Sequence, residues 1–279
     1  MSLADFHIHS NASDGTDSAE TLIKKLHDLN IKYFSITDHD TIKNSVKCLD
    51  TPGFIIGIEF SCHYNYNKIH ILGLNFNHKN KYFIEALNAG DELRHKKFFT
   101  RVKFLHDNFN INFSDSEIEE LLKTPSVGKP HLVNFLVEKN YANDKLQAFH
   151  MLDKCNTKND KLDSDFVIKS ILKADGIPVW AHPLGGEGEN ILPEDIFNSQ
   201  LQTLISNGLM GLECFYSKYD YDTCLKLSKT AKLNNLLVSG GSDYHGSNKK
   251  IPLAKLNSDN IPVQHDNLSI VQYLTKGIL

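Results

Sequence analysis

Short apolar segments rich in β-branched and aromatic residues alternate along the chain with segments that have the periodicity of amphipathic helices. The apolar segments predict seven strands, at residues 3–8, 32–37, 54–60, 69–74, 177–180, 211–215 and 236–239. Strands that alternate with helices favour a parallel sheet, and seven of them favour a closed or nearly closed barrel. The pattern therefore predicts an α/β fold.

Signals for helix ends lie between several of these strands. Asp17 and Glu20 have the spacing of a capping box and predict a helix that begins there, which makes the first unit β-α-β. Pro193 and Gly208 bracket another predicted helix. Residues 223–233 have the pattern of a helix that crosses over to the last strand.

Residues 77–165 break this alternation, because they contain no convincing strand pattern. Three amphipathic runs predict helices there, at residues 82–106, 117–122 and 131–138. Ser114 and Glu117 have capping-box spacing for the second. We interpret the stretch as a helical insertion over the barrel mouth. The expected division is a discontinuous barrel domain (1–76 and 166–257), the insertion (77–165), and residues 258–279, to which the pattern assigns no role.

Composition narrows the class of protein. A formal net charge of −4 over 279 residues argues against a broad basic surface that coats nucleic acid. The five cysteines are scattered and form no C-x-x-C pair, so neither a disulfide framework nor a structural zinc site is indicated. Because no apolar run approaches the roughly 18 residues of a membrane span and no signal-peptide pattern is present, we expect a cytoplasmic protein.

Side chains that bind metals cluster where the predicted strands end. His7 and His9 are two residues apart, so both imidazoles point to the same side of the first strand. Asp14 follows in a turn that Gly15 allows to fold back. Because the carboxyl ends of parallel barrel strands open on one face, residues far apart in sequence converge there. The nine candidate ligands are His7, His9, Asp14, His39, Glu59, His70, His182, Asp243 and His245.

Imidazole and carboxylate donors without thiolates suit Mn, Fe or Zn at a catalytic site. Any one of these residues alone has the simpler interpretation of a strand-end polar group satisfied by its neighbours. Nine of them at six of seven strand ends are difficult to explain in that way. The other histidines lie in predicted helices or loops, where solvent-exposed or capping roles fit better: His27, His63, His78, His95, His106, His150 and His265.

The motifs around these ligands resemble those of a known family. They are DFHIHS (5–10), SDG (13–15), TDHD (37–40), GIE (57–59), AHP (181–183) and GSDYH (241–245). Their identity and order resemble the PHP family (polymerase and histidinol phosphatase). The resemblance implies a distorted (β/α)7 barrel with a trinuclear metal centre. It implies three groups of ligands: His7, His9, Glu59 and Asp243; Glu59 as a bridge with His70 and His182; and Asp14, His39 and His245.

The segment GKPH (128–131), the insertion and aspartate at position 14 resemble the stand-alone nucleotide phosphoesterases of the family. Those proteins usually have arginine where this chain has Lys129, so the cation is kept and the bidentate fork is lost. By resemblance, Lys129 and His131 would bind substrate phosphate, and His131 could protonate the leaving group. The alternative interpretation is an ordinary helix start with Pro130 in its first turn.

The expected chemistry follows from charge. Three divalent ions would carry six positive charges against the three negative charges of Asp14, Glu59 and Asp243, so a phosphate would bind and a metal-bound hydroxide would attack it. The carboxylates expected to orient the ligating imidazoles are Asp5, Asp38 and Asp40.

We therefore expect a phosphoesterase with two to three Mn, Fe or Zn ions. Its expected substrate is a small anionic nucleotide: a 3′,5′-bisphosphate, a mononucleotide or short 5′-phosphorylated RNA. Histidinol phosphatase is the alternative enzyme, which Asp14 and residues 128–131 disfavour. A non-enzymatic, metal-stabilised scaffold is the third hypothesis, and the complete ligand set disfavours it.

Overall fold

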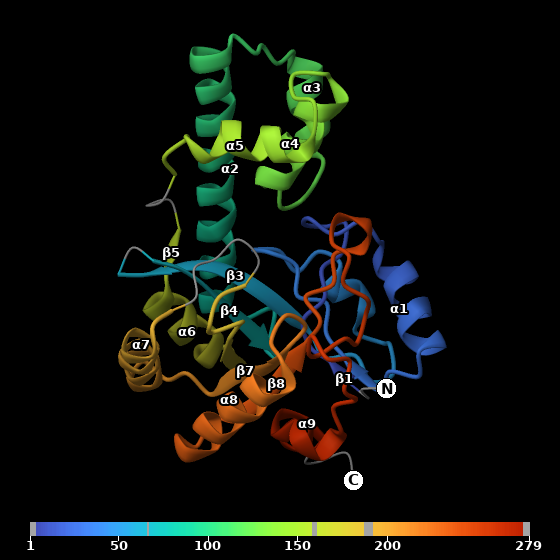
Figure 1. Cartoon of the computed structure of the whole chain (residues 1–279), viewed down its shortest axis with the longest axis vertical. Helices are drawn as coiled ribbons and strands as arrows, with labels where there is room; N and C mark the ends of the chain where they lie inside the picture. Colours follow the sequence, from blue (N-terminus) through green and yellow to red (C-terminus); the bar gives the residue numbers. More distant parts are fainter. Residues whose placement is uncertain (1–3, 66, 158–160, 187–191, 276–279) are drawn as a thin grey trace.

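The computed structural model describes residues 4–65, 67–157, 161–186 and 192–275, and the side chain of His265 is not described. It consists of a sheet with helices packed around it and a group of helices that projects from one end (Figure 1). The strands are β1 (Ala4–Asp5), β2 (Tyr33–Phe34), β3 (Gly57–Tyr64), β4 (Asn67–Leu74), β5 (Leu162–Asp163), β6 (Ile177–Trp180), β7 (Gly211–Tyr216) and β8 (Leu237–Gly241). The α/β class is thereby confirmed.

Nine α-helices and three short 3₁₀ helices lie within the described residues. The helices that pack around the sheet are α1 (Ala19–Asp28), α6 (Ser164–Lys173), α7 (Glu194–Ser206), α8 (Tyr221–Leu233) and α9 (Ser269–Thr275). The projecting group consists of α2 (Lys81–Phe109), α3 (Asp115–Leu122), α4 (Lys129–Glu138) and α5 (Lys145–Asp153). The 3₁₀ helices are η1 (Ser45–Cys48), η2 (Gly246–Asn248) and η3 (His265–Asn267).

The strands form a six-stranded sheet in the order β5-β3-β4-β6-β7-β8 and a separate pair, β1-β2. Strand β4 is antiparallel to both β3 and β6, whereas the other pairs are parallel. The expectation of an all-parallel sheet is therefore wrong at β4. The physical reason is the short connection after Tyr64, since a parallel partner would need a crossover of a dozen residues or more.

Backbone hydrogen bonds join the β1-β2 pair to β8 and to the segment before β3. The amide of Phe6 donates to the carbonyl of Gly240 at 3.1 Å, beside β8. The amide of Ile55 donates to the carbonyl of Phe34 at 2.8 Å, just before β3. The β1-β2 pair thus lies next to β8 on one side and next to the segment that leads into β3 on the other.

The hydrophobic core fills the space between the sheet and its helices. Phe6, Phe60 and Trp180 are completely or almost completely buried in it, and α6, α8 and α9 pack against the strands. Helix α9 belongs to the tail that had no predicted role, and the Ser269 hydroxyl at its start accepts from the amide of Val238 on β8 at 2.9 Å.

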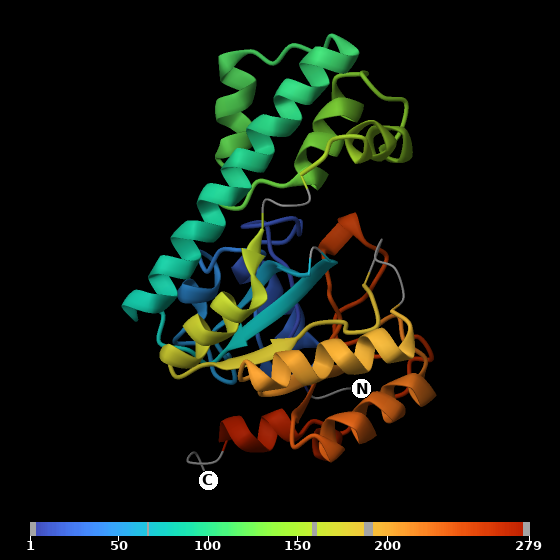
Figure 2. The ribbon, with the colours of Figure 1, turned by 90° about the vertical axis from the view of Figure 1, so that its left-hand side faces the viewer.

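The long helix α2 runs from the side of the sheet into the projecting group (Figure 2). Its first turns belong to the core of the sheet, because Phe83 and Ala86 are buried there. Farther along, Phe98 and Leu105 belong to a separate core that α4 and α5 complete. The helices expected at 82–106, 117–122 and 131–138 are confirmed, as is the capping box of Ser114 and Glu117.

Three elements differ from the expectation. Strand β5 and helix α5 lie within residues where we predicted neither, because two strand residues and a short helix leave little periodicity. The capping box at Asp17 is wrong: Ser18 is the N-cap of α1, and its hydroxyl accepts from the amide of Thr21. The carboxylate of Asp17 instead pairs with Lys25, at 2.7 Å.

Replacement by alanine should have opposite effects on stability at two glycines. A Cβ added at Gly90, inside α2, would lie 3.5 Å or more from its nearest neighbours, so Gly90→Ala should raise the free energy of unfolding by about 0.5–1 kcal/mol. A Cβ at Gly241 would lie 2.2 Å from the Cβ of His7, so Gly241→Ala should lower it by about 1–3 kcal/mol. Urea unfolding curves measure both changes. A destabilised Gly90→Ala variant would contradict this account of α2.

Candidate metal centre

All nine residues that the sequence predicts as metal ligands come together beside the sheet. They follow β1, β2, β6 and β8 or lie within β3 and β4. Their candidate ligand atoms form four groups, within each of which the atoms lie no more than 4.8 Å apart. The groups are His9, Asp14, His39 and His245; His7, His9 and Asp243; His7, Glu59 and His182; and His39, Glu59 and His70.

Glu59 lies at the centre of the cluster and is almost completely buried. Its Oε1 atom is 2.8 Å from Nδ1 of His70 and 3.3 Å from Nε2 of His182. Its Oε2 atom is 2.9 Å from Nδ1 of His39 and 3.2 Å from Nε2 of His9. One carboxylate thus faces imidazoles from several strands, as expected of a group that bridges two ions.

Strand β4 brings His70 to this point because of its direction. In register, His70 lies opposite Ser61 of β3, and its carbonyl accepts from the amide of Ala181 at 3.0 Å, just after β6. Because β4 runs opposite to its neighbours, a residue near its start lies beside their carboxyl ends. The position of His70 at the beginning of its predicted strand was thus a signal for the antiparallel direction.

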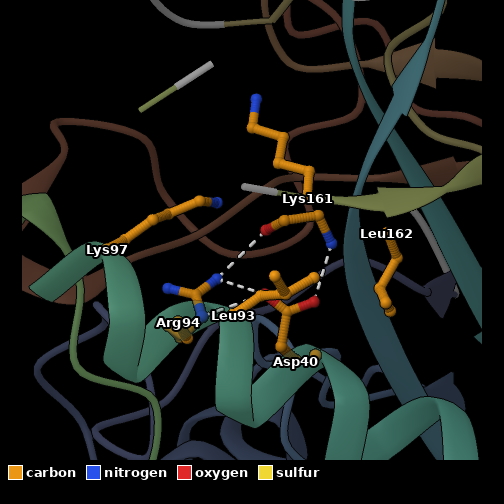
Figure 3. Close-up of a pocket in the computed structure, with 8 residues that line it drawn as sticks. Asp40, Leu93, Arg94, Lys97, Lys161 and Leu162 are labelled. Atoms are coloured by element: carbon orange, nitrogen blue, oxygen red, sulfur yellow. Dashed lines mark hydrogen bonds and ion pairs between the residues drawn. The ribbon is translucent and has the colours of Figure 1, made fainter. Parts of the chain in front are cut away.

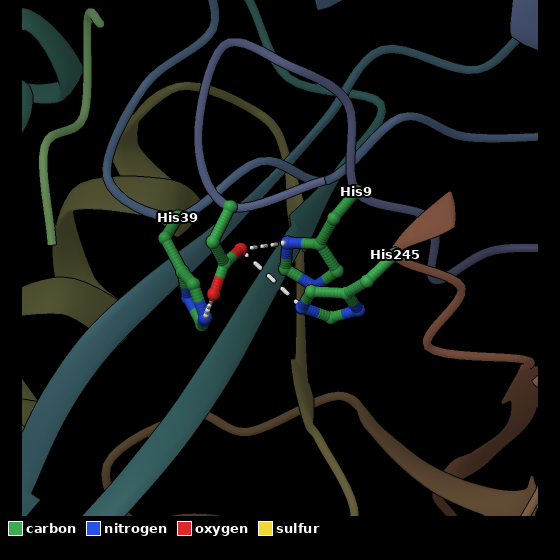
Figure 4. A group of neighbouring side chains, drawn as sticks. His9, His39 and His245 are labelled. Carbon is green, nitrogen blue, oxygen red and sulfur yellow. Dashed lines mark ion pairs between the residues drawn. The ribbon is translucent and has the colours of Figure 1, made fainter. Parts of the chain in front are cut away.

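Asp14 forms a second focus, with three imidazoles around its carboxylate (Figure 4). Its Oδ1 atom is 3.3 Å from Nε2 of His245 and 3.6 Å from Nδ1 of His9. Its Oδ2 atom is 3.8 Å from Nε2 of His39. His9 and His39 also face Glu59, so the two foci share ligands.

Several buried atoms of the cluster lie near oppositely charged groups but lack the geometry of a hydrogen bond with any described residue. They are His7 Nε2, His9 Nε2, Asp14 Oδ1, His39 Nδ1 and Glu59 Oε2. Such atoms are rare in folded proteins, because an unsatisfied buried polar group costs about 1–3 kcal/mol. These atoms converge and are donors that Mn, Fe and Zn accept, so the residues fit divalent ions.

The pKa shifts within the cluster also favour bound cations. Burial lowers the pKa of His9, but the carboxylates of Asp243 and Glu59 outweigh it and raise that pKa to about 9. Burial raises the pKa of Glu59, yet the imidazoles around it, His70 foremost, hold it well below its usual range. The carboxylates therefore favour positive charge between the imidazoles. Divalent ions would supply that charge, since a metal binds the neutral imidazole.

Glu213 contacts two of the candidate ligands, and it was not among the site residues predicted from the sequence. It is completely buried in β7, where its Oε1 atom is 2.9 Å from Nδ1 of His7 and its Oε2 atom accepts from the amide of His182 at 2.7 Å. It therefore orients one imidazole and fixes the backbone of a second candidate ligand. A charged residue inside the apolar segment 211–215 was the available signal.

Asp5, Asp38 and Asp40 do not have the role that we expected, because none of their hydrogen bonds with described residues reaches an imidazole. Asp5 accepts from the amide and hydroxyl of Ser242, at 2.9 and 2.6 Å. Asp38 accepts from the hydroxyls of Ser10 and Ser13, at 2.5 and 2.6 Å. These carboxylates hold the loops that carry the ligands.

Asp40 instead faces the insertion, where it pairs with Arg94 of α2 (Figure 3). Nε of Arg94 donates to Asp40 Oδ2 at 2.9 Å, and Nη2 donates to Ser61 Oγ at 3.0 Å. The Arg94 Nη1 atom would lie 3.1 Å from a Cβ added at Gly128. Arg94 therefore joins the insertion to strand β3 and to the loop that carries His39, and no sequence pattern indicated this role.

Lys129, which we expected to bind a substrate phosphate, contacts helix α5. It forms an ion pair with Asp153 and lies over the ring of Phe149, and both partners belong to α5. His131 is close to Asp14 but is held by the backbone: its Nδ1 accepts from the amide of Gly128 at 2.9 Å, and it also bonds to the backbone of Ser13. Both contacts favour a structural role over proton transfer.

The segment that carries most of the cluster matches a known protein domain. The profile of the PHP domain matches residues 5–123, which carry six of the nine candidate ligands. Phosphoribosyl 1,2-cyclic phosphate 1,2-diphosphodiesterase of Eggerthella lenta is 23% identical over 264 residues, which cover 90% of this chain and 97% of that protein. A 5′-3′ exoribonuclease of Haemophilus influenzae is 27% identical over 255 residues, which cover 86% and 89%.

Two solved structures share the fold. A candidate metal-dependent phosphoesterase from Bifidobacterium adolescentis has a TM-score of 0.77 and 23% identity, with 92% of this chain and 93% of that chain covered. An amidohydrolase from Chromobacterium violaceum has a TM-score of 0.76 and 20% identity, with 90% of each chain covered. At these identities the likeness concerns the fold. Among the helices described here, none has the length and apolar character to cross a membrane.

The fit of the cluster to divalent ions predicts the metal content. Purified protein should contain two to three equivalents of Mn, Fe or Zn by elemental analysis. Removing the ions with a chelator should lower the melting temperature by several degrees, because bound ions stabilise only the folded state. An unchanged melting curve after removal and reloading would count against a metal centre.

Glu59→Gln should lower metal content and turnover more than Asp38→Asn does. Glu59 faces ligands of several groups, whereas Asp38 acts through Ser10 and Ser13. A supporting group typically contributes about 10–100-fold in metal affinity or activity, which sets the expected loss for Asp38→Asn. Elemental analysis and steady-state rates measure both. Equal, small losses would mean that Glu59 is not the bridge.

Proposed function

We propose that this chain, whose residues 5–123 match the PHP domain, is a metal-dependent phosphoesterase that hydrolyses a phosphate ester of a nucleotide. The proposal rests on the position of Glu59. Its carboxylate is buried among imidazoles, some of which also face Asp14 and Asp243. Phosphoesterase activity agrees with the phosphodiesterase and exoribonuclease relatives. We further infer that the seven predicted strands close into a distorted barrel, which the hydrogen bonds of Phe6 and Ile55 support.

The nine clustered residues would hold two to three ions, in the groups that share Glu59, His7 and His9. Divalent ions at this place supply positive charge for a phosphate and activate water for attack on phosphorus. The chain's own contribution is positioning. Glu213 fixes His7, and Asp38 holds the turn before Asp14.

Arg94 is better placed than Lys129 to contact a second phosphate of the substrate. Its Nε and Nη2 atoms are held by Asp40 and Ser61, whereas its Nη1 atom has no hydrogen-bond acceptor among the described residues and points toward Gly128. A guanidinium held in this way presents a fixed donor to an anion. The phosphate contact that the sequence suggested for Lys129 is therefore assigned to Arg94.

Cyclic phosphate diesters are the second candidate substrate. The specific observation is the Eggerthella lenta phosphodiesterase, 97% of whose length aligns with this chain. Histidinol phosphate is a third candidate, which aspartate rather than histidine at position 14 disfavours.

A substrate panel tests the proposal directly. Protein loaded with Mn²⁺ should hydrolyse nucleoside 3′,5′-bisphosphates, mononucleotides or 5′-phosphorylated oligoribonucleotides with a higher kcat/KM than phosphoribosyl 1,2-cyclic phosphate or histidinol phosphate. Release of phosphate or mononucleotide measures the rates. A preference for the cyclic diester would replace the nucleotide assignment, and absence of hydrolysis of every ester would contradict the enzyme itself.

Arg94→Lys should raise KM for a 3′,5′-bisphosphate by about 10-fold or more, because the variant keeps a cation for Asp40 but loses the Nη1 donor, and a charge-assisted hydrogen bond contributes about 1.5–3 kcal/mol. KM for p-nitrophenyl phosphate, which has a single phosphate, should stay unchanged. Lys129→Met is the control and should leave both KM values unchanged. A larger effect of Lys129→Met would return the phosphate contact to Lys129.

A further inference from the structure

The loop after β8 brings the side chain of Lys249 next to the candidate metal centre. Nζ of Lys249 lies 2.9 Å from Oδ2 of Asp243, and only 19% of the lysine side chain is exposed. Neither residue charge nor spacing singled out this lysine in the sequence. The ion pair nevertheless places a cation directly behind one of the candidate ligands.

The loop that carries Lys249 is fixed to the turn that carries Asp14. The amide of Ser247 donates to the hydroxyl of Thr16 at 3.0 Å, and the side-chain amide of Asn248 donates to the carbonyl of Asp14 at 2.8 Å. Lys249 is the next residue, so its backbone is held on one side by these bonds. Its position relative to Asp243 is thus built into the fold.

The two carboxylate oxygens of Asp243 have different surroundings. Oδ2 contacts Lys249 and accepts from the hydroxyl of Tyr216 at 3.0 Å. Oδ1 faces the cluster instead, at 3.3 Å from Nε2 of His9 and 3.6 Å from Nε2 of His7. One oxygen is therefore engaged by the protein, and the other is directed at the group formed by His7, His9 and Asp243.

We infer that Lys249 is a positioning residue of the metal centre, which together with Tyr216 holds Oδ2 of Asp243 and leaves Oδ1 as the single oxygen offered to an ion. The inference rests on the proposed function, because it requires that the cluster binds metal. Without the clamp, the carboxylate can rotate about its last torsion, which is broad for aspartate. An ion would then have to fix a ligand that the folded protein now fixes in advance.

The charge of Lys249 has an opposing effect, since a cation near a metal site repels the ion. Two features limit this repulsion. The ammonium contacts the oxygen that faces away from the cluster, and its partial exposure allows solvent to screen it. Outer partners of metal ligands typically contribute about 10–100-fold in metal affinity or activity, so orientation should outweigh repulsion.

The test compares Lys249→Met with Lys250→Met in the full chain. Lys250 is the adjacent, exposed lysine, so it controls for the loss of one positive charge from the same loop. Metal-free protein is titrated with Mn²⁺, and bound and free ions are counted by electron paramagnetic resonance. Lys249→Met should weaken the affinity for at least one Mn²⁺ by about 10–100-fold. Lys250→Met should bind as the wild type does, and Lys249→Arg should retain most of the affinity.

Tyr216→Phe provides a second variant that removes only a hydroxyl from the clamp. It should weaken the same Mn²⁺ site by a smaller factor, and its effect should not add to that of Lys249→Met, because both act on one oxygen. KM for p-nitrophenyl phosphate at saturating Mn²⁺ should stay unchanged in Lys249→Met.

Three results would overturn the inference. They are equal Mn²⁺ affinity in Lys249→Met and Lys250→Met, tighter binding in Lys249→Met, and a raised KM with unchanged Mn²⁺ affinity, which would make Lys249 a substrate contact. Each of these requires that the wild-type protein binds Mn²⁺, so the proposed function survives them. A wild-type protein that binds no Mn²⁺ would overturn the proposed function as well.

Discussion

The candidate metal centre depends on the pairing of the buried Glu59 carboxylate with the imidazoles around it. The carboxylate lies within 3.4 Å of imidazole nitrogens of His7, His9, His39, His70 and His182. A buried negative charge persists only when it is paired and hydrogen-bonded, so the imidazoles and the carboxylate require one another. Because those imidazoles come from β1, β2, β4 and β6 or the loops after them, the sheet must bring these elements to one point.

The clustering of the nine candidate ligands could be predicted from the sequence, because each is a metal-binding side chain near the end of an apolar segment. His7, His9 and His245 each stand where an apolar segment ends, and short local patterns of this kind do not depend on long-range contacts. The direction of β4 was missed, because the general alternation of strands and helices outweighed the short connection after Tyr64. That connection and the early place of His70 in its strand together were sufficient to predict it.

The supporting groups were beyond prediction for a different reason. Asp38 and Asp40 flank His39 in the sequence and Asp5 stands two residues before His7, but all three bond to loops or to Arg94 instead. Glu213, Arg94 and Lys249 lie far from the residues that they contact. Such contacts depend on the packing of whole elements. Lys129 forms its ion pair with Asp153 on α5, a helix that the sequence pattern did not predict.

The order of the ligands along the chain has a consequence for biosynthesis. Six of the nine precede residue 71, whereas His182, Asp243 and His245 come much later. The first strand depends on the last, because Phe6 and Asp243 form their backbone bonds across β1 and β8. During synthesis from the N-terminus, the early histidines therefore leave the ribosome well before the strand that covers them. An ion captured by the nascent chain would be held by an incomplete set of ligands, so final loading belongs to the released protein.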